Sequence, residues 1–78
     1  MGPREIVLEI VCAHTSATGF GDDVPLGADG LGLDSIAIAE VLLECEVRLG
    51  APMSELLEAR GPLTVARIAE HLEAAAAR

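Results

Sequence analysis

Apolar residues recur at the spacing of an α-helix in four segments of this chain, and that pattern restricts the possible folds more than any other feature. Positions three and four apart share one face of a helix, so each segment predicts an amphipathic helix. The first spans residues 3–14, where a proline is acceptable in the opening turn. Its expected core face consists of Ile6, Val7, Ile10 and Val11.

The other three helices are bounded by recognisable start and stop signals. The second is expected to begin at Asp34 or Ser35 and to end at Gly50, because a glycine followed closely by a proline terminates helices. A short third helix is expected over residues 53–60, and Thr64 is expected to cap a fourth. The apolar residues of the third helix are Met53, Leu56 and Leu57. The predicted buried stripe of the fourth consists of Val65, Ile68, Ala69, Leu72 and Ala76.

A long stretch without clear periodicity, residues 15–33, separates the first two helices. It holds five glycines, three aspartates and one proline. A loop of this length is uncommon in a compact domain unless it has a function. The apolar residues expected to pin this loop onto the helices are Phe20, Val24, Leu26 and Leu31.

These elements predict an all-α fold, a small four-helix bundle of three longer helices and one short helix, with a long loop between the first two. The chain is expected to form a single domain over residues 1–78. A domain of this size buries only about 60% of the surface of its unfolded chain, so its core must be simple. Phe20 is the one aromatic residue, and the rest of the apolar content favours helices over strands.

Thirteen acidic residues oppose five arginines, and the net charge is −8. A negative surface repels a phosphate backbone, so nucleic acid is not an expected partner. The apolar runs are too short to span a bilayer, and Glu5 and Glu9 interrupt the N-terminal one. We therefore expect a cytoplasmic monomer that does not engage a membrane.

Residue types that carry catalysis or bind metals are few and scattered. Cys12 and Cys45 form no CxxC pair, and we expect both to be small buried hydrophobic residues. His14 and His71 are expected at the surface or its boundary, with no carboxylate spaced to orient either ring. The sequence therefore predicts no catalytic residue and no metal site.

Ser35 follows Asp34 at the start of the second helix, and taken alone this pair indicates an N-terminal cap worth about 1 kcal/mol. Two features favour a functional site. The glycine-rich residues 30–33 should present the serine hydroxyl at the end of a flexible loop. A helix N-terminus also has free N–H groups and a partial positive charge, which suit an esterified phosphate.

The second helix carries two apolar stripes, whereas a surface helix needs only one. The broader stripe, expected to face the core, consists of Ile38, Val41, Leu42, Cys45 and Leu49. The narrower stripe consists of Ile36, Ala39, Leu43 and Val47. Glu40 and Glu46 flank the narrower stripe, which resembles a docking surface with an acidic rim. The alternative is that the long loop folds over this stripe and buries it.

The segment Gly-Leu-Asp-Ser-Ile at residues 32–36 resembles the one on which acyl carrier proteins bear a 4'-phosphopantetheine arm. The helix of about four turns after it, the long loop before it and a last helix opened by Thr-Val extend the resemblance over nearly the whole chain. The resemblance implies that Ser35 carries the arm. It also implies that Asp34 is recognised by the transferase that attaches the arm.

A protein of this family is a carrier and not a catalyst. The resemblance implies that a phosphopantetheinyl transferase with Mg²⁺ moves the arm from coenzyme A to Ser35, and that the arm then holds acyl groups as thioesters. The expected partners are this transferase and acyl-loading or acyl-processing enzymes such as ligases, ketosynthases and acyltransferases. Ile36, Glu40 and Leu43 fall on the helix face that such carriers present to partners. The predicted partner-binding set adds Ala39, Glu46 and Val47 from the same stripe and its rim.

The chain departs from carriers of fatty-acid synthesis at several positions. Val47 and Arg48 stand where those carriers continue an acidic run, and Ala37 replaces a commonly acidic residue. These departures and the lysine-free, Ala- and Arg-rich composition favour polyketide or other specialised biosynthesis. An aminoacyl or peptidyl carrier is one alternative, although that class usually has Gly-Gly-His-Ser where this chain has Asp34 before the serine. The other is a small acidic helical interaction module, in which Ser35 is only a cap and the narrower stripe binds a partner helix.

Overall fold

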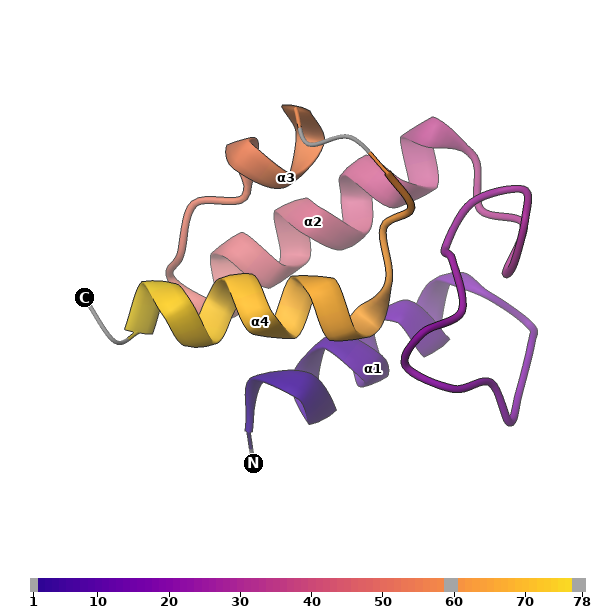
Figure 1. Cartoon of the computed structure of the whole chain (residues 1–78), viewed down its shortest axis with the longest axis horizontal. Helices are drawn as coiled ribbons and strands as arrows, with labels where there is room; N and C mark the ends of the chain where they lie inside the picture. The colour runs from indigo at the N-terminus through magenta and orange to yellow at the C-terminus, as the bar shows by residue number, and fades with distance from the viewer. Residues whose placement is uncertain (1, 59–60, 77–78) are drawn as a thin grey trace.

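The computed structural model describes residues 2–58 and 61–76 and is drawn in Figure 1. In this part of the chain there are four α-helices and no strand. α1 spans Pro3–His14, α2 spans Ser35–Leu49, α3 spans Ser54–Glu58 and α4 spans Val65–Ala76. The described chain is therefore all-α, as the apolar spacing predicts. Among the described helices, none combines the length and hydropathy that a bilayer crossing requires.

α1 begins and ends at the predicted residues. Pro3 occupies its first turn, where a missing N–H costs nothing. Val7, Ile10 and Val11 are buried, and Ile6 packs half-buried against the same core. Both α2 and α4 pack on this helix, so the core lies where these three helices meet (Figure 1).

α2 has a cap at each end. Asp34 precedes it with φ −79° and ψ 175°, and its side chain accepts a hydrogen bond from the Ala37 amide. Gly50 follows it with φ 68°, a left-handed conformation that glycine adopts without steric cost, and its amide donates to the Glu46 carbonyl at 2.8 Å. The predicted broad stripe faces the core. Its buried members are Val41, Leu42 and Cys45, and its half-buried members are Ile38 and Leu49.

α3 is a short helix that starts at Ser54, one residue later than predicted. Met53 nevertheless stays buried in the connection before it, and Leu56 is buried from the helix itself. The predicted end of this helix at Arg60 and the side chain of Leu57 lie outside the described residues.

α4 begins after Thr64, whose hydroxyl accepts a hydrogen bond from the Arg67 amide at 3.1 Å, as predicted for a cap. The buried members of its stripe are Val65, Ile68, Ala69 and Leu72. The prediction that Ala76 is buried is wrong. Ala76 is the last residue of α4, and it is exposed because it lines an open hollow together with Pro3. Ala75 packs against the core instead.

Residues 15–34 contain no helix or strand and lie beside the C-terminal end of α1 and the N-terminal end of α2 (Figure 1). Three of the four predicted anchors pack against the core. Leu26 is fully buried, and Phe20 and Leu31 are partly buried. The fourth, Val24, is half-buried. Apolar contacts therefore hold this long loop against the helices.

Backbone hydrogen bonds also attach the loop to the segment that leads into α4. The Leu26 amide donates to the Leu63 carbonyl at 2.8 Å, and the Ala66 amide donates to the Asp22 carbonyl at 3.1 Å. The Asp22 carboxylate forms an ion pair with Arg4 of α1. Because Asp22 contacts both α1 and α4, the middle of the loop has a defined position against these two helices.

Candidate functional site

Ser35 is the first residue of α2, and it is exposed. Its hydroxyl makes no hydrogen bond to any other described residue. The first N–H groups of a helix lack intrahelical acceptors and carry the positive end of the helix dipole. A phosphate esterified to the Ser35 oxygen would therefore lie in a favourable field.

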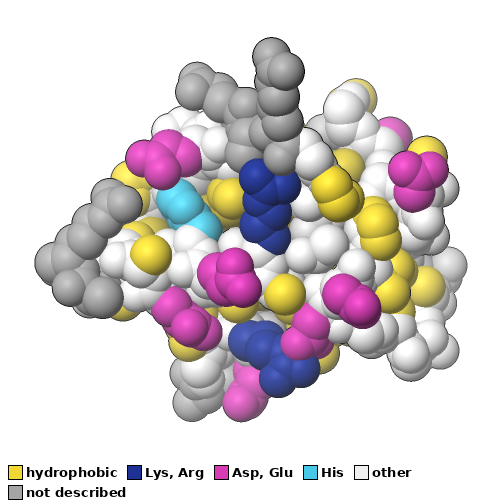
Figure 2. Space-filling model, in the orientation of Figure 1, with side chains coloured by type: hydrophobic (Ala, Val, Ile, Leu, Met, Phe, Trp, Pro, Cys, Tyr) yellow, Lys and Arg dark blue, Asp and Glu magenta, His cyan; other side chains and the backbone are white. Residues whose placement is uncertain are grey.

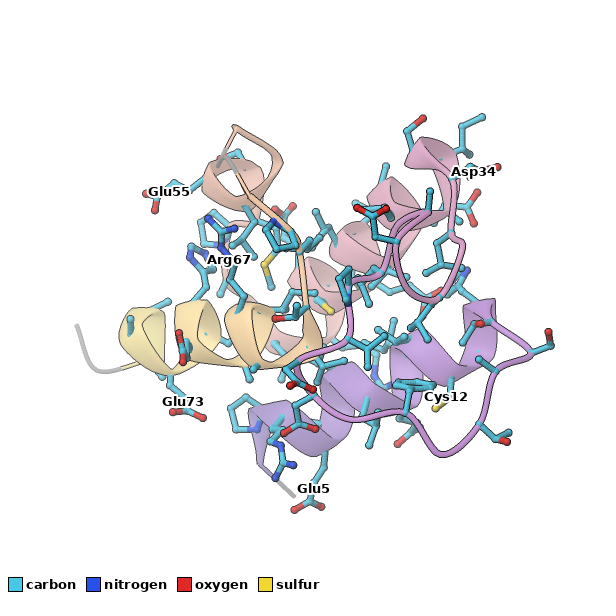
Figure 3. The ribbon with its side chains drawn as sticks, turned by 45° about the vertical axis from the view of Figure 1, so that its right-hand side comes forward. Glu5, Cys12, Asp34, Glu55, Arg67 and Glu73 are labelled. Carbon is cyan, nitrogen blue, oxygen red and sulfur yellow. The ribbon has the colours of Figure 1, made fainter. Side chains whose placement is uncertain are left out.

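Asp34, and not Ser35, is the cap of α2. Its Oδ1 accepts a hydrogen bond from the Ala37 amide at 2.8 Å, and its backbone carbonyl accepts from the Ile38 amide at 3.0 Å. Figure 3 shows Asp34 at the outer tip where the loop meets the helix. One oxygen of this carboxylate is thus committed to the first turn, while the side chain as a whole stays exposed.

Backbone hydrogen bonds attach the segment just before this tip to the loop residues that precede it. The Leu33 amide donates to the Leu26 carbonyl, and the Leu31 amide donates to the Pro25 carbonyl, both at 2.9 Å. Gly32 lies between these two bonds with φ 75°. Because Leu26 is part of the core, the serine is presented from an anchored segment.

The narrower apolar stripe of α2 points away from the core, and we call Ile36, Ala39, Leu43 and Val47 the outer strip. The three large side chains, Ile36, Leu43 and Val47, are 70%, 60% and 75% exposed. Ala39 is exposed as well. The alternative that the loop buries this stripe is therefore wrong. A row of exposed apolar side chains beginning next to Ser35 is typical of an interaction surface.

Acidic side chains beside the outer strip contact other parts of their own chain. Glu40 Oε2 lies 3.8 Å from His14 Nδ1, and Glu44 Oε1 lies 3.0 Å from His14 Nε2. On the other flank, Glu46 Oε1 accepts a hydrogen bond from the Met53 amide at 3.1 Å. Glu40 and Glu46, expected only to face partners, therefore also connect α2 to α1 and to the start of α3.

The prediction that no carboxylate orients a histidine is wrong for His14. Glu40 and Glu44 stand one helical turn apart, a spacing visible in the sequence, but only the packing of α1 on α2 brings them to the ring. They approach opposite ring nitrogens, so a single metal ion could not bind all three groups. Within the described residues no group of three such side chains is placed so that it could hold a metal ion. His71 Nε2 lies 2.8 Å from the Pro52 carbonyl and helps to hold the connection between α2 and α3.

The two cysteines have different environments. Cys45 is buried as predicted, and burial raises the pKa of its thiol to about 11. The prediction that Cys12 is also buried is wrong, because this residue is exposed on α1 beside the loop (Figure 3). Cys12 lies on the same side of α1 as the half-buried Leu8, and both residues line a pocket together with residues of the loop.

An open groove of about 340 Å³ lies between α2 and the start of α3. The residues that line it are Ala39, Leu42, Leu43, Glu46, Met53 and Ser54. It adjoins the outer strip, since Ala39 and Leu43 belong to both. Sequence patterns did not predict this groove, because it depends on how the short α3 packs on α2.

Negative charge is not gathered in one patch on the face over α4. Figure 2 shows acidic side chains there singly, between apolar and arginine side chains. Arg67 of α4 is half-buried and donates a hydrogen bond to the Pro62 carbonyl at 3.2 Å. The outer strip of α2 differs, because its large side chains are apolar and aligned along one helix.

Comparison with protein-family models, with curated proteins and with solved structures finds no match for this chain. The candidate site therefore rests on the geometry of Ser35, Asp34 and the outer strip.

Proposed function

We propose that this chain is an acyl carrier protein whose Ser35 bears a 4'-phosphopantetheine arm. The observation that carries the proposal is the exposed hydroxyl of Ser35 at the first position of α2, which bonds to no other described residue and lies directly beside an exposed apolar strip. A carrier needs both features: an attachment oxygen that an enzyme can reach, and a surface on which that enzyme can dock. The fold that belongs to the proposal is a four-helix bundle in which α1 supports both α2 and α4.

The residues around Ser35 fit the proposed arm. The helix N-terminus stabilises the negative charge of the phosphodiester, and the exposure of Ser35 and Ile36 leaves room for the chain that extends from it. In the transfer, the Ser35 oxygen forms a bond to the phosphorus next to pantetheine in coenzyme A. The pyrophosphate bond breaks, adenosine bisphosphate leaves, and the hydroxyl proton passes to a base of the transferase. When bound, the arm supplies the thiol that holds acyl groups as thioesters.

The outer strip is the proposed docking surface for the transferase and for the acyl-loading and acyl-processing enzymes. Burial of a leucine-sized side chain contributes roughly 1.5–3 kcal/mol, so Ile36, Leu43 and Val47 together can anchor a partner. Glu40 and Glu46 remain exposed at its edges and can meet basic groups. In this proposal the protein acts in the cytoplasm as a monomer and catalyses no reaction itself, and it serves polyketide or other specialised biosynthesis.

Incubation with coenzyme A, Mg²⁺ and a broad-specificity phosphopantetheinyl transferase tests the proposal. The intact mass should increase by one phosphopantetheine, and subsequent incubation with an acyl donor and a ligase should add a hydroxylamine-labile acyl group. A chain that stays unmodified beside a carrier that is modified in the same mixture would favour the interaction module. A holo-protein loaded only with amino acids would favour the aminoacyl or peptidyl carrier.

A further inference from the structure

His14 is the last residue of α1, and its imidazole ring lies between two carboxylates of α2. Its side chain is 17% exposed, whereas that of Glu40 is 59% exposed. Nε2 lies 3.0 Å from Glu44 Oε1, which is a hydrogen-bond distance, and Nδ1 lies 3.8 Å from Glu40 Oε2, which is not. The ring is therefore bonded to one carboxylate and stops short of the other.

The protonation state of the ring decides whether it pairs with Glu40. A neutral imidazole carries one N–H, and the hydrogen-bond distance assigns that proton to Nε2, facing Glu44. Nδ1 then offers Glu40 a lone pair and no donor. An imidazolium has a donor on both nitrogens and directs the second one toward Glu40. Histidine is the side chain whose charge ordinarily changes between about pH 5 and pH 8.

Glu40 connects this ring to the proposed docking surface. Ile36 precedes it by one helical turn and Leu43 follows it by nearly one, so Glu40 lies beside both large side chains of the outer strip. A partner that covers the strip removes this carboxylate from water, and a buried carboxylate requires a charged or hydrogen-bonding partner. The partner that fits the surface is therefore an enzyme that places a cationic side chain against Glu40.

We propose that His14 regulates docking on the outer strip. Its imidazolium pairs with Glu40 and competes with the cationic group of the partner enzyme, and its neutral form leaves Glu40 to that group. Docking is then stronger at about pH 8 than at about pH 6. This inference rests on the proposed function of the outer strip and adds to it a regulation by pH.

The charged groups around the ring support an action on these two carboxylates alone. On the loop, Asp22 is paired with Arg4 near the other end of α1. At the same contact between α1 and α2, Arg48 is paired with Glu9 at 3.6 Å. No charged side chain of α4 or of the loop, among the described residues, forms an ion pair with His14. A proton gained by the ring therefore acts on the acidic edge of α2.

KM for the carrier in arm transfer is measured at about pH 6 and at about pH 8, with coenzyme A, Mg²⁺ and one broad-specificity phosphopantetheinyl transferase. The ratio of the two KM values is compared between proteins, because the pH dependence of the transferase itself is common to all of them. His14→Gln removes the titrating ring, and Glu40→Gln removes its target on the docking surface. Glu44→Gln is the matched control, since it removes an equal charge from the other carboxylate that contacts the ring.

On going from the higher to the lower pH, KM of the wild type should rise about twofold to fivefold more than KM of His14→Gln, which is the range expected for a partly exposed ion pair. This additional rise should disappear in Glu40→Gln and persist in Glu44→Gln. If His14 only held α1 against α2, the two glutamate variants would not differ in this way.

Two results would overturn the inference: equal KM ratios in the wild type and His14→Gln, or an additional rise that persists in Glu40→Gln. If His14→Gln did not fold, the comparison of Glu40→Gln with Glu44→Gln would decide. A wild type that gains no arm would refute the proposed function instead. The NMR signal of the Glu40 carboxyl carbon would then test the contact, because it should respond to pH over this range in the wild type and not in His14→Gln. Absence of that response would show that His14 does not act on Glu40.

Discussion

The carboxylate of Glu46 accepts a hydrogen bond from the backbone amide of Met53 at 3.1 Å, and this bond joins α2 to the start of α3. On the other side of the same connection, His71 of α4 contacts the Pro52 carbonyl at 2.8 Å. A helix of five residues does not persist on its own. α3 is therefore held by its buried Leu56 and by the buried Met53 just before it, together with these two polar contacts.

The first prediction concerns this contact. Glu46→Ala should lower the free energy of unfolding by about 1–2 kcal/mol, because the partly buried Met53 amide loses its acceptor. Glu46→Gln is the matched control, since its amide oxygen can accept the same bond, and it should retain most of the stability. Urea unfolding curves measure both variants. Equal stability of Glu46→Ala and the wild type would show that the bond contributes nothing.

The second prediction concerns the outer strip. Leu43 is 60% exposed, so Leu43→Asp should change the free energy of unfolding by about 0.5 kcal/mol or less. Transfer of the arm should suffer more, with KM raised by one to two orders of magnitude, because burial of a leucine in the complex is worth roughly 1.5–3 kcal/mol. Melting curves and transfer kinetics on the same preparation test this.

Leu42 provides the control for that substitution, because it is adjacent in sequence and 1% exposed. Leu42→Asp introduces an unpaired carboxylate into the core and should unfold the protein. A folded Leu43→Asp variant with unimpaired transfer and acyl loading would contradict the docking role of the strip.

The sequence allowed the helices and their caps to be predicted, because those features depend on neighbouring residues. Asp34, Gly50 and Thr64 mark helix ends by chemistry that acts within four residues. The two stripes of α2 followed from the helical period, and Leu26 and Leu31 were identified as anchors because they interrupt a polar loop. These predictions needed no knowledge of how the helices pack.

The errors and omissions concern contacts that arise only on packing. His14 meets Glu44 across thirty positions of sequence, so no local pattern indicated the pair. Cys12 looked like a core residue by its type, yet its thiol is exposed in the folded chain. The role of Glu46 was missed for the same reason, because the Met53 amide reaches it only when α3 folds back on α2.

The third prediction concerns the turn that presents the serine. A Cβ at Gly30 would collide with the Pro25 carbonyl oxygen and would lie 2.9 Å from a methyl carbon of Val24. That carbonyl accepts a hydrogen bond from the amide of Leu31, one of the residues that anchor the loop. Gly30→Ala should therefore displace Leu31 and lower the free energy of unfolding by about 1–3 kcal/mol. Arm transfer should become slower as well. Thermal unfolding and transfer rates provide the measurements.

Gly27 is the matched glycine for this test, because a Cβ there meets nothing within 4 Å. Gly27→Ala should stay within about 0.5 kcal/mol of the wild type. If Gly30→Ala were as stable as Gly27→Ala, the close approach of residue 30 to Pro25 would not be a constraint on the loop.

The fourth prediction is a loss of stability at alkaline pH. The pKa of Cys45 is raised from 9.0 to about 11 in the folded protein, so the unfolded chain releases this proton first as pH rises. The associated stability is complete below pH 9 and is lost between pH 9 and 11, at a cost on the order of 2 kcal/mol. Unfolding curves across this range should show the fall, and Cys45→Ala should reduce it.

Thiol labelling checks the same environments independently. In the native protein iodoacetamide should modify one cysteine quickly, and Cys12→Ser should abolish that fast reaction, because Cys45 is fully buried. Rapid labelling of both thiols in the native state would contradict the burial of Cys45.

The fifth prediction tests the attachment point, on which the whole functional account depends. The chain has three serines, and Ser54 is the closest match to Ser35 because both are exposed and both open a helix. Intact-mass measurement after incubation with coenzyme A and the transferase should show one added phosphopantetheine on the wild type and on Ser54→Ala. Ser35→Ala should show none while unfolding within about 0.5 kcal/mol of the wild type, since its hydroxyl makes no bond to other described residues. A Ser35→Ala variant that still acquires the arm, or a wild type that never does, would contradict the account.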